Sequence, residues 1–182
     1  MSIEPPASAY DMGHAVEAEA LATFAVLVDN EPGVLHRVVG LFAARGYNIE
    51  SLTVAETDPS AHTSRITIVT RGTPHVLAQI EAQLQKMVST RHVQNVTKDP
   101  NGVERELALI KVRGVGAERV EALRIADIFR AKVIDTTIES FIFELTGASS
   151  KIAKFVGLMR PLGLVEVSRT GVLSIDRGVE TL

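Results

Sequence analysis

The chain has 182 residues, of which 46% are hydrophobic and 23% charged, with a formal net charge of -3; this composition is that of a globular protein with one medium or two small domains. The net negative charge argues against a binder of phosphate backbones, which would carry a basic face, and the 4% of aromatic residues leaves few stacking platforms for bases. The absence of cysteine excludes disulfides and thiol chemistry, and the absence of an apolar run of about 18 residues argues against a membrane span. We expect a cytoplasmic protein that contacts neither nucleic acid nor membrane.

The first twenty residues have a composition of their own. The segment 1–20 contains no Lys or Arg but several acidic residues and two prolines. A secretory signal needs a basic start with an apolar run, and a transit peptide needs arginine. We therefore expect a disordered acidic extension over 1–20.

From Leu21 the hydrophobic pattern predicts a series of short elements. Apolar residues from Val34 to Phe42 fall at helical spacing, and Gly46 suits the end of that helix. Polar and apolar residues alternate on both sides of a turn-forming stretch at 57–64, which predicts a hairpin. The expected order is a strand at 23–28, a helix at 34–42, strands at 49–54 and 66–70, a helix at 76–87 and a strand at 93–96.

The same order of elements recurs after the turn at Asp99-Pro100-Asn101-Gly102. The pattern predicts strands at 107–112, 133–134, 138–145 and 164–167 and helices at 118–129 and 152–159. Each β-α-β-β-α-β unit predicts a four-stranded antiparallel sheet with both helices on one face. We expect an α+β protein of two ferredoxin-like domains in tandem, at 21–98 and 103–180, whose helix-free sheet faces are solvated or covered by another protein.

Motifs for catalysis or metal binding are missing. Gly114-Val115-Gly116 follows a strand and precedes a helix, but Arg119 stands where a dinucleotide-binding fingerprint needs its third glycine. There is no nucleophile elbow, and the histidines do not form a pair at metal-ligand spacing. These features indicate a protein that is not itself an enzyme and holds no metal.

The first strand-to-helix junction, Asp29 to Leu35, is the candidate binding site. The start of a helix offers unpaired N–H groups and a positive dipole potential, which suit a small carboxylate. Gly33 lets a ligand approach the main chain, and Asn30 is suited either to cap the helix or to donate to the ligand. The side chain of Asn48 can accept from an ammonium group. These residues describe a site for a free aliphatic amino acid, although an N-cap followed by an ordinary turn explains the same residues.

Long stretches of the sequence resemble one family. Three of them are Asn30-Glu31-Pro32-Gly33-Val34-Leu35, Arg45-Gly46-Tyr47-Asn48-Ile49-Glu50-Ser51-Leu52 and Ile128-Phe129-Arg130-Ala131-Lys132-Val133-Ile134-Asp135. They resemble the small-subunit family of acetolactate synthase, also called acetohydroxyacid synthase. The resemblance covers nearly everything after the first twenty residues.

This resemblance implies an N-terminal ACT domain, a C-terminal ferredoxin-like domain and a homodimer formed through the ACT domains. It also implies that valine binds at the ACT–ACT interface. The implied contacts are Asn30, Gly33, Val34 and Leu35 of one subunit, with Asn48 and Ile49 of its neighbour. Pro32 lies within this loop but lacks an N–H donor, so we assign it no contact.

The resemblance further implies a regulatory role. The partner would be the large catalytic subunit, which holds thiamine diphosphate, Mg²⁺ and FAD, whereas this chain would hold no cofactor. The chain would activate that subunit and confer feedback inhibition in valine, isoleucine and leucine biosynthesis. A free-standing ACT-type amino-acid sensor is the main alternative, and a ferredoxin-like enzyme and an RNA-binding module are weaker ones.

Overall fold

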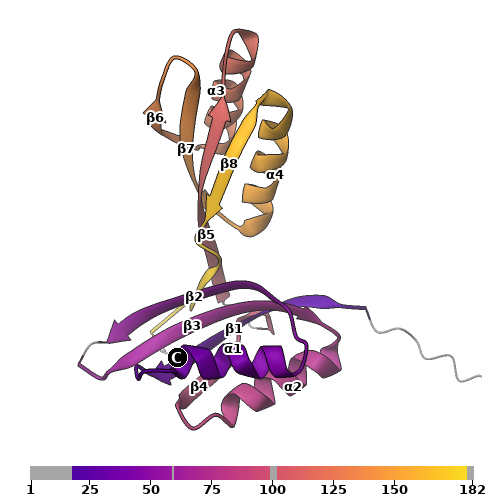
Figure 1. Cartoon of the computed structure of the whole chain (residues 1–182), viewed down its shortest axis with the longest axis vertical. Coiled ribbons are helices and arrows are strands. Elements are labelled where there is room, and N and C mark those ends of the chain that lie inside the picture. The colour runs from indigo at the N-terminus through magenta and orange to yellow at the C-terminus, as the bar shows by residue number, and fades with distance from the viewer. Residues whose placement is uncertain (1–17, 59, 99–101, 180–182) are drawn as a thin grey trace, which may run out of the picture.

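The computed structural model describes residues 18–58, 60–98 and 102–179. It contains two α+β units, each a β-α-β-β-α-β arrangement with antiparallel strands, so the expected fold class is confirmed. Figure 1 shows the second unit standing on the sheet of the first. Among the described residues, no helix is long and apolar enough to cross a membrane.

The first unit is a four-stranded sheet in the order β2-β3-β1-β4 with two helices on one face. Its elements are β1 (Ala20–Asp29), α1 (Val34–Ala44), β2 (Ile49–Asp58), β3 (Thr63–Gly72), α2 (Pro74–Gln85), β4 (Thr90–Asn95) and the 3-10 turn η1 (Val96–Lys98). The core lies between the sheet and the helices, where Val38 and Phe42 of α1 and Ile80 of α2 pack against Phe24 and Ile68. This arrangement leaves β2 at the edge of the sheet, paired on one side only.

The second unit repeats this plan in the order β6-β7-β5-β8. Its elements are β5 (Gly102–Arg113), α3 (Ala117–Phe129), β6 (Lys132–Thr136), β7 (Ser140–Gly147), α4 (Ser149–Met159), η2 (Arg160–Leu162), β8 (Leu164–Arg169) and β9 (Leu173–Asp176). Three aromatic rings anchor its core: Phe143 lies 5.5 Å from Phe141 and 5.9 Å from Phe155, measured between ring centroids.

A two-stranded ribbon connects the units, and the hydrophobic pattern did not predict it. The last eight residues of β5 pair with β7, and residues 108–112 also pair with β8, but its first four residues, Gly102 to Arg105, pair with β9. This ribbon lies against the helix-free face of the first sheet, where Val172 contacts β2. Ala25 and Thr67 point to that face and are almost completely buried. The chain therefore covers part of a face that we expected solvent or another protein to cover.

An ion pair between Glu106 and Arg169 lies where the ribbon enters the second unit. The carboxylate of Glu106, on β5, is only 3% exposed and receives a bidentate bond from the Arg169 guanidinium and a bond from the Ser149 hydroxyl. Burial acts to raise the pKa of Glu106. The bonds from Arg169 and Ser149, the charge of Arg169 and the Gly171 N–H outweigh it, so the pKa lies below its usual value.

We predict that Glu106→Gln destabilises the protein at neutral pH by about 1–3 kcal/mol, because it weakens a buried charge-assisted network. Since folding lowers the pKa of Glu106, its contribution is present above the unfolded value near 4.5 and is lost as pH falls through the folded value. The difference between wild type and variant should therefore shrink in acid. Denaturant unfolding at pH 7 and below pH 4 checks this, with Glu166→Gln at an exposed ion pair as a nearly neutral control. A pH-independent difference would contradict the prediction.

Candidate functional site at the ends of helix α1

The loop from Asn30 to Gly33 turns the chain from β1 into α1. Gly33 is the N-cap residue and has φ of 88°, a left-handed conformation that favours glycine. No side chain caps the helix, so the capping role considered for Asn30 is not what the structure shows. The first-turn amide of Leu35 therefore has no intrahelical acceptor, and its N–H remains available to an anion.

Glu31 holds this loop in place, a role that the hydrophobic pattern could not indicate. Its carboxylate receives bonds from Arg37 at 2.6 Å and from the Ser89 hydroxyl at 2.7 Å. The Ser89 bond, followed by the charge and hydrogen bond of Arg37, lowers the pKa of Glu31. The backbone N–H of Asn30 donates to the His62 carbonyl at 2.7 Å, which ties the loop to the β2–β3 hairpin. The loop is therefore preorganised.

The predicted contacts Val34, Leu35 and Asn30 differ in what they can offer a ligand. The side chain of Val34 is only 6% exposed and belongs to the core, and its amide donates to the Glu31 carbonyl at 3.2 Å. Leu35 is 39% exposed, so its side chain can form an apolar wall. Asn30 is exposed, and its side-chain N–H donates to Glu56 at 3.1 Å, which leaves the amide oxygen to accept from a ligand.

Asn48 and Ile49 lie after α1, where the chain enters β2. The Asn48 carbonyl accepts from the Thr70 hydroxyl at 2.6 Å, and its side-chain N–H donates to Glu50 at 3.1 Å. Ile49 is partly buried and packs against the core of the first unit. Asn48 is exposed and, like Asn30, presents an amide oxygen suited to an ammonium group.

The structure does not bring the two groups of residues together within one chain. They flank α1, whose 11 residues span about 16 Å at 1.5 Å per residue. A small amino acid cannot contact both groups at that separation. A site that uses all six residues therefore needs a second chain.

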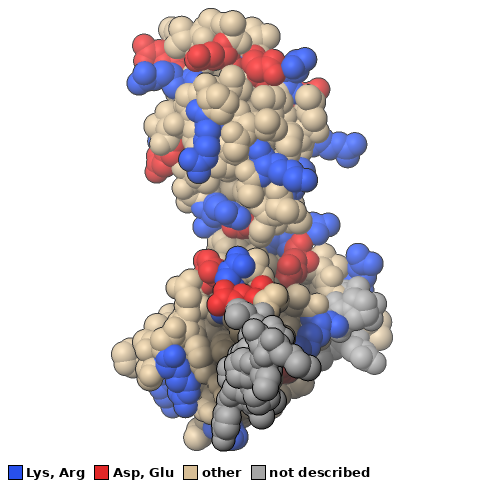
Figure 2. Space-filling view, turned by 90° about the vertical axis from the view of Figure 1, so that its right-hand side faces the viewer, with Lys and Arg blue, Asp and Glu red and all other residues tan. Residues whose placement is uncertain are grey.

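A hollow lies between the two units. Its volume is about 550 Å³, and acidic, basic and hydroxyl side chains line it, including Glu50 and Arg71 of the first unit and Glu104 and Arg169 of the ribbon. Figure 2 shows acidic and basic side chains gathered where the two units meet. In the described part of the chain, no group of three or more His, Asp or Glu side chains could hold a metal ion.

Fold and site together define a two-domain protein of the ACT class. Residues 24–92 match the family model described as "AHAS small subunit-like ACT domain", and residues 105–178 match the one described as "Small subunit of acetolactate synthase". The chain belongs to the family of acetolactate synthase small subunits.

Individual relatives agree with this assignment. The chain is 46% identical to a probable acetolactate synthase small subunit of Archaeoglobus fulgidus, over 86% of this chain and 96% of the relative. It is also 46% identical to the acetolactate synthase isozyme 3 small subunit of Escherichia coli, over 84% of this chain and 93% of the relative. The crystal structure of the small subunit from Thermotoga maritima superimposes with a TM-score of 0.78 at 39% identity, covering 88% of this chain and 99% of that chain. Together with the ACT domain, these small-subunit relatives support a regulatory role for this chain.

We predict that alanine substitutions at Gly33, just before α1, and at Gly40, inside α1, have opposite effects on stability. Gly33→Ala should cost about 1–2 kcal/mol, because φ of 88° is unfavourable for a residue with a Cβ although nothing lies within 4 Å. Gly40→Ala should stabilise by up to about 1 kcal/mol, because it lies inside the helix with equally open space. Denaturant unfolding at one fixed protein concentration measures both. Equal effects at the two positions would contradict the left-handed conformation of Gly33.

Proposed function

We propose that this chain binds the large catalytic subunit of acetolactate synthase, raises its activity and makes it sensitive to valine. Membership of the small-subunit family supports this proposal, as does the ACT domain. The thiamine diphosphate, Mg²⁺ and FAD of the reaction belong, in this proposal, to the large subunit. The complex works in the cytoplasm, with residues 21–98 as the sensing domain and residues 103–180 as the second domain.

Valine binds where two ACT domains meet side by side. The observation that carries this placement is the separation of the two residue groups at opposite ends of α1, next to an unpaired strand edge. Pairing of β2 with β2 of a second chain would satisfy both edges and remove a surface open to aggregation. It would also bring the Asn30 loop of one chain toward Asn48 of the other.

The chemistry of the two groups matches the two ends of an amino acid. The start of α1, with the Leu35 amide and Gly33, receives the carboxylate. The amide oxygens of Asn30 and Asn48 accept from the ammonium group, helped by the nearby carboxylates of Glu56 and Glu50. The side chains of Leu35 and Ile49 supply the apolar walls for a branched side chain.

Inhibition requires that valine bind the inhibited arrangement of the complex more tightly than the active one. A coupling free energy of about 1–3 kcal/mol, or roughly 5–150-fold in affinity, is sufficient. Acetolactate production by the large subunit, with and without this chain and across a valine titration, tests the proposal. Activation together with new valine inhibition supports it, whereas no change in either would leave only an amino-acid sensor for another client.

We predict that mixing two variants that each bind valine weakly restores valine binding. Asn30→Ala and Asn48→Ala homodimers should each lose at least about tenfold in valine affinity, because each loses a hydrogen bond to a charged group, worth about 1.5–3 kcal/mol. A mixed dimer has both defects in one site and neither in the other. Titration calorimetry on the mixed dimer should therefore find about one wild-type site per dimer.

The same titration distinguishes a shared site from one within a single chain. A site within one chain would carry a defect in every copy, so mixing would restore nothing. Valine binding that is unaffected in both homodimers would instead remove these residues from the site. Lys154→Ala, on an exposed position of α4, is the control for handling and mixing.

A further inference from the structure

A β-bulge near the start of β2 turns Ile49 and Ser51 to opposite faces of the sheet. Ile49 pairs with Thr70, Ser51 pairs with Val69, and the register shifts between them. In a regular strand Ile49 and Ser51 would point to the same face. The bulge at Glu50 instead leaves Ile49 against the helices and turns Ser51 toward the second unit.

Ser51 and Thr53 together hold both backbone groups of Val172. The Val172 N–H donates to the Ser51 hydroxyl at 3.2 Å, and the Thr53 hydroxyl donates to the Val172 carbonyl at 3.2 Å. Val172 is only 8% exposed, so this contact is shielded from water. The strand that carries the proposed effector contacts is thereby bonded directly to the segment that leads to the C-terminal domain.

That segment is a second β-bulge. Four residue steps separate Arg169 from Leu173, whereas only three separate their partners Ala108 and Arg105 on β5. The strand from β8 to β9 therefore carries one extra residue, and Gly171 within it has φ of 83°. A Cβ at Gly171 would overlap the Ser51 hydroxyl, so the two strands touch here with no room for a side chain.

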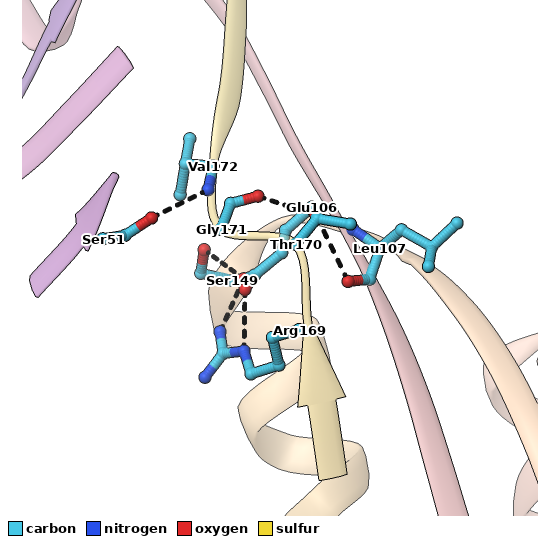
Figure 3. A network of polar contacts seen from close by, with 8 residues as sticks. All are labelled: Ser51, Glu106, Leu107, Ser149, Arg169, Thr170, Gly171 and Val172. Carbon is cyan, nitrogen blue, oxygen red and sulfur yellow. Dashed lines mark hydrogen bonds and ion pairs between the residues drawn. The ribbon is translucent and has the colours of Figure 1, made fainter. Parts of the chain in front are cut away.

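The other side of the bulge is anchored in the C-terminal domain. Thr170 exchanges backbone and side-chain bonds with Leu107, and Arg169 is paired with the buried Glu106. Glu106 also accepts from Ser149, the first residue of α4. Figure 3 shows Ser51 pointing at Val172 on one side of this segment and Arg169, Ser149 and Glu106 meeting on the other.

We propose that the segment Thr170–Gly171–Val172, clamped between Ser51 and Glu106, transmits effector binding at β2 to the position of the C-terminal domain. Ser51 and Gly171 are then positioning residues that do not touch the effector. The route is short, since about three residue steps of roughly 3.3 Å separate Asn48 from Ser51. The hollow of about 550 Å³ beside the segment leaves space for the domains to change their relative orientation. This inference rests on the proposed valine-regulated function.

Gly171→Ala in the full chain, reconstituted with the large subunit, tests the proposal. The added methyl group pushes Ser51 away and strains the backbone, so the half-inhibitory valine concentration should rise at least about fivefold, the lower end of typical allosteric coupling. Valine affinity of the small subunit alone, measured by calorimetry, should change less than about twofold. Gly178→Ala is the matched control, because its φ is also positive, at 100°, but nothing lies within 4 Å.

The outcomes separate this inference from the function on which it rests. Wild type that neither binds valine nor confers inhibition would refute the proposed function, whatever the variants do. If wild type does both and Gly171→Ala keeps both unchanged, the coupling role is wrong. Loss of valine binding in folded Gly171→Ala would also overturn it, because the segment would then belong to the binding site. If Gly171→Ala does not fold, Ser51→Ala tests the inference instead, because it removes the bond to Val172. It should weaken valine inhibition of the complex while leaving the valine affinity of the small subunit nearly unchanged.

Discussion

One continuous strand, β5, belongs to both halves of the molecule, and the remaining architecture depends on it. Its first four residues pair with β9 against the ACT sheet, its last eight pair with β7 inside the C-terminal sheet, and residues 108–112 also pair with β8. Two antiparallel strands therefore join the domains, where a single flexible linker would leave them independent. The buried carboxylate of Glu106, where the pairing of β5 changes from β9 to β7, fixes the returning strand through Arg169. A small domain is marginally stable alone, and the ribbon covers apolar and hydroxyl-bearing residues that the ACT sheet would otherwise expose.

This ribbon places the C-terminal domain on β2, the strand that is also a free edge of the ACT sheet. The Asn48 end of β2 faces outward to a second chain in the proposed assembly, and Ser51 and Thr53 face the ribbon. A bulge between them makes both assignments possible on one short strand. Effector binding and domain orientation are then two properties of the same strand, which gives a physical basis for the proposed regulation.

Hydrophobic periodicity was sufficient to predict the two repeated units, because the helices and strands such as β5 and β7 bury one face, as the pattern from Val34 to Phe42 shows for α1. It also pointed to the start of α1, where Gly33 adopts the left-handed conformation that the turn requires. It could not predict β9, a strand of four residues in which the apolar Leu173 and Ile175 are exposed and the polar Ser174 is buried, the reverse of the usual pattern. Nor could it identify Glu31, Ser89 or Glu106 as anchors, because their partners are distant in sequence and a lone polar residue carries no periodic signal. The expected extension at 1–20 falls largely outside the described residues, which begin at 18, and β1 starts at Ala20.

In the proposed regulation, effector binding to the ACT domain changes how the C-terminal domain is oriented on it. The chain has no cysteine, so spin labels can be placed at Ala82→Cys on α2 and Lys154→Cys on α4, both exposed. Labelled chains diluted with unlabelled ones in the complex with the large subunit report the distance within one chain by pulsed electron resonance. We expect saturating valine to shift this distance distribution in wild type, and the Gly171→Ala variant to show a smaller shift. Identical distributions with and without valine, in a complex that valine inhibits, would contradict it.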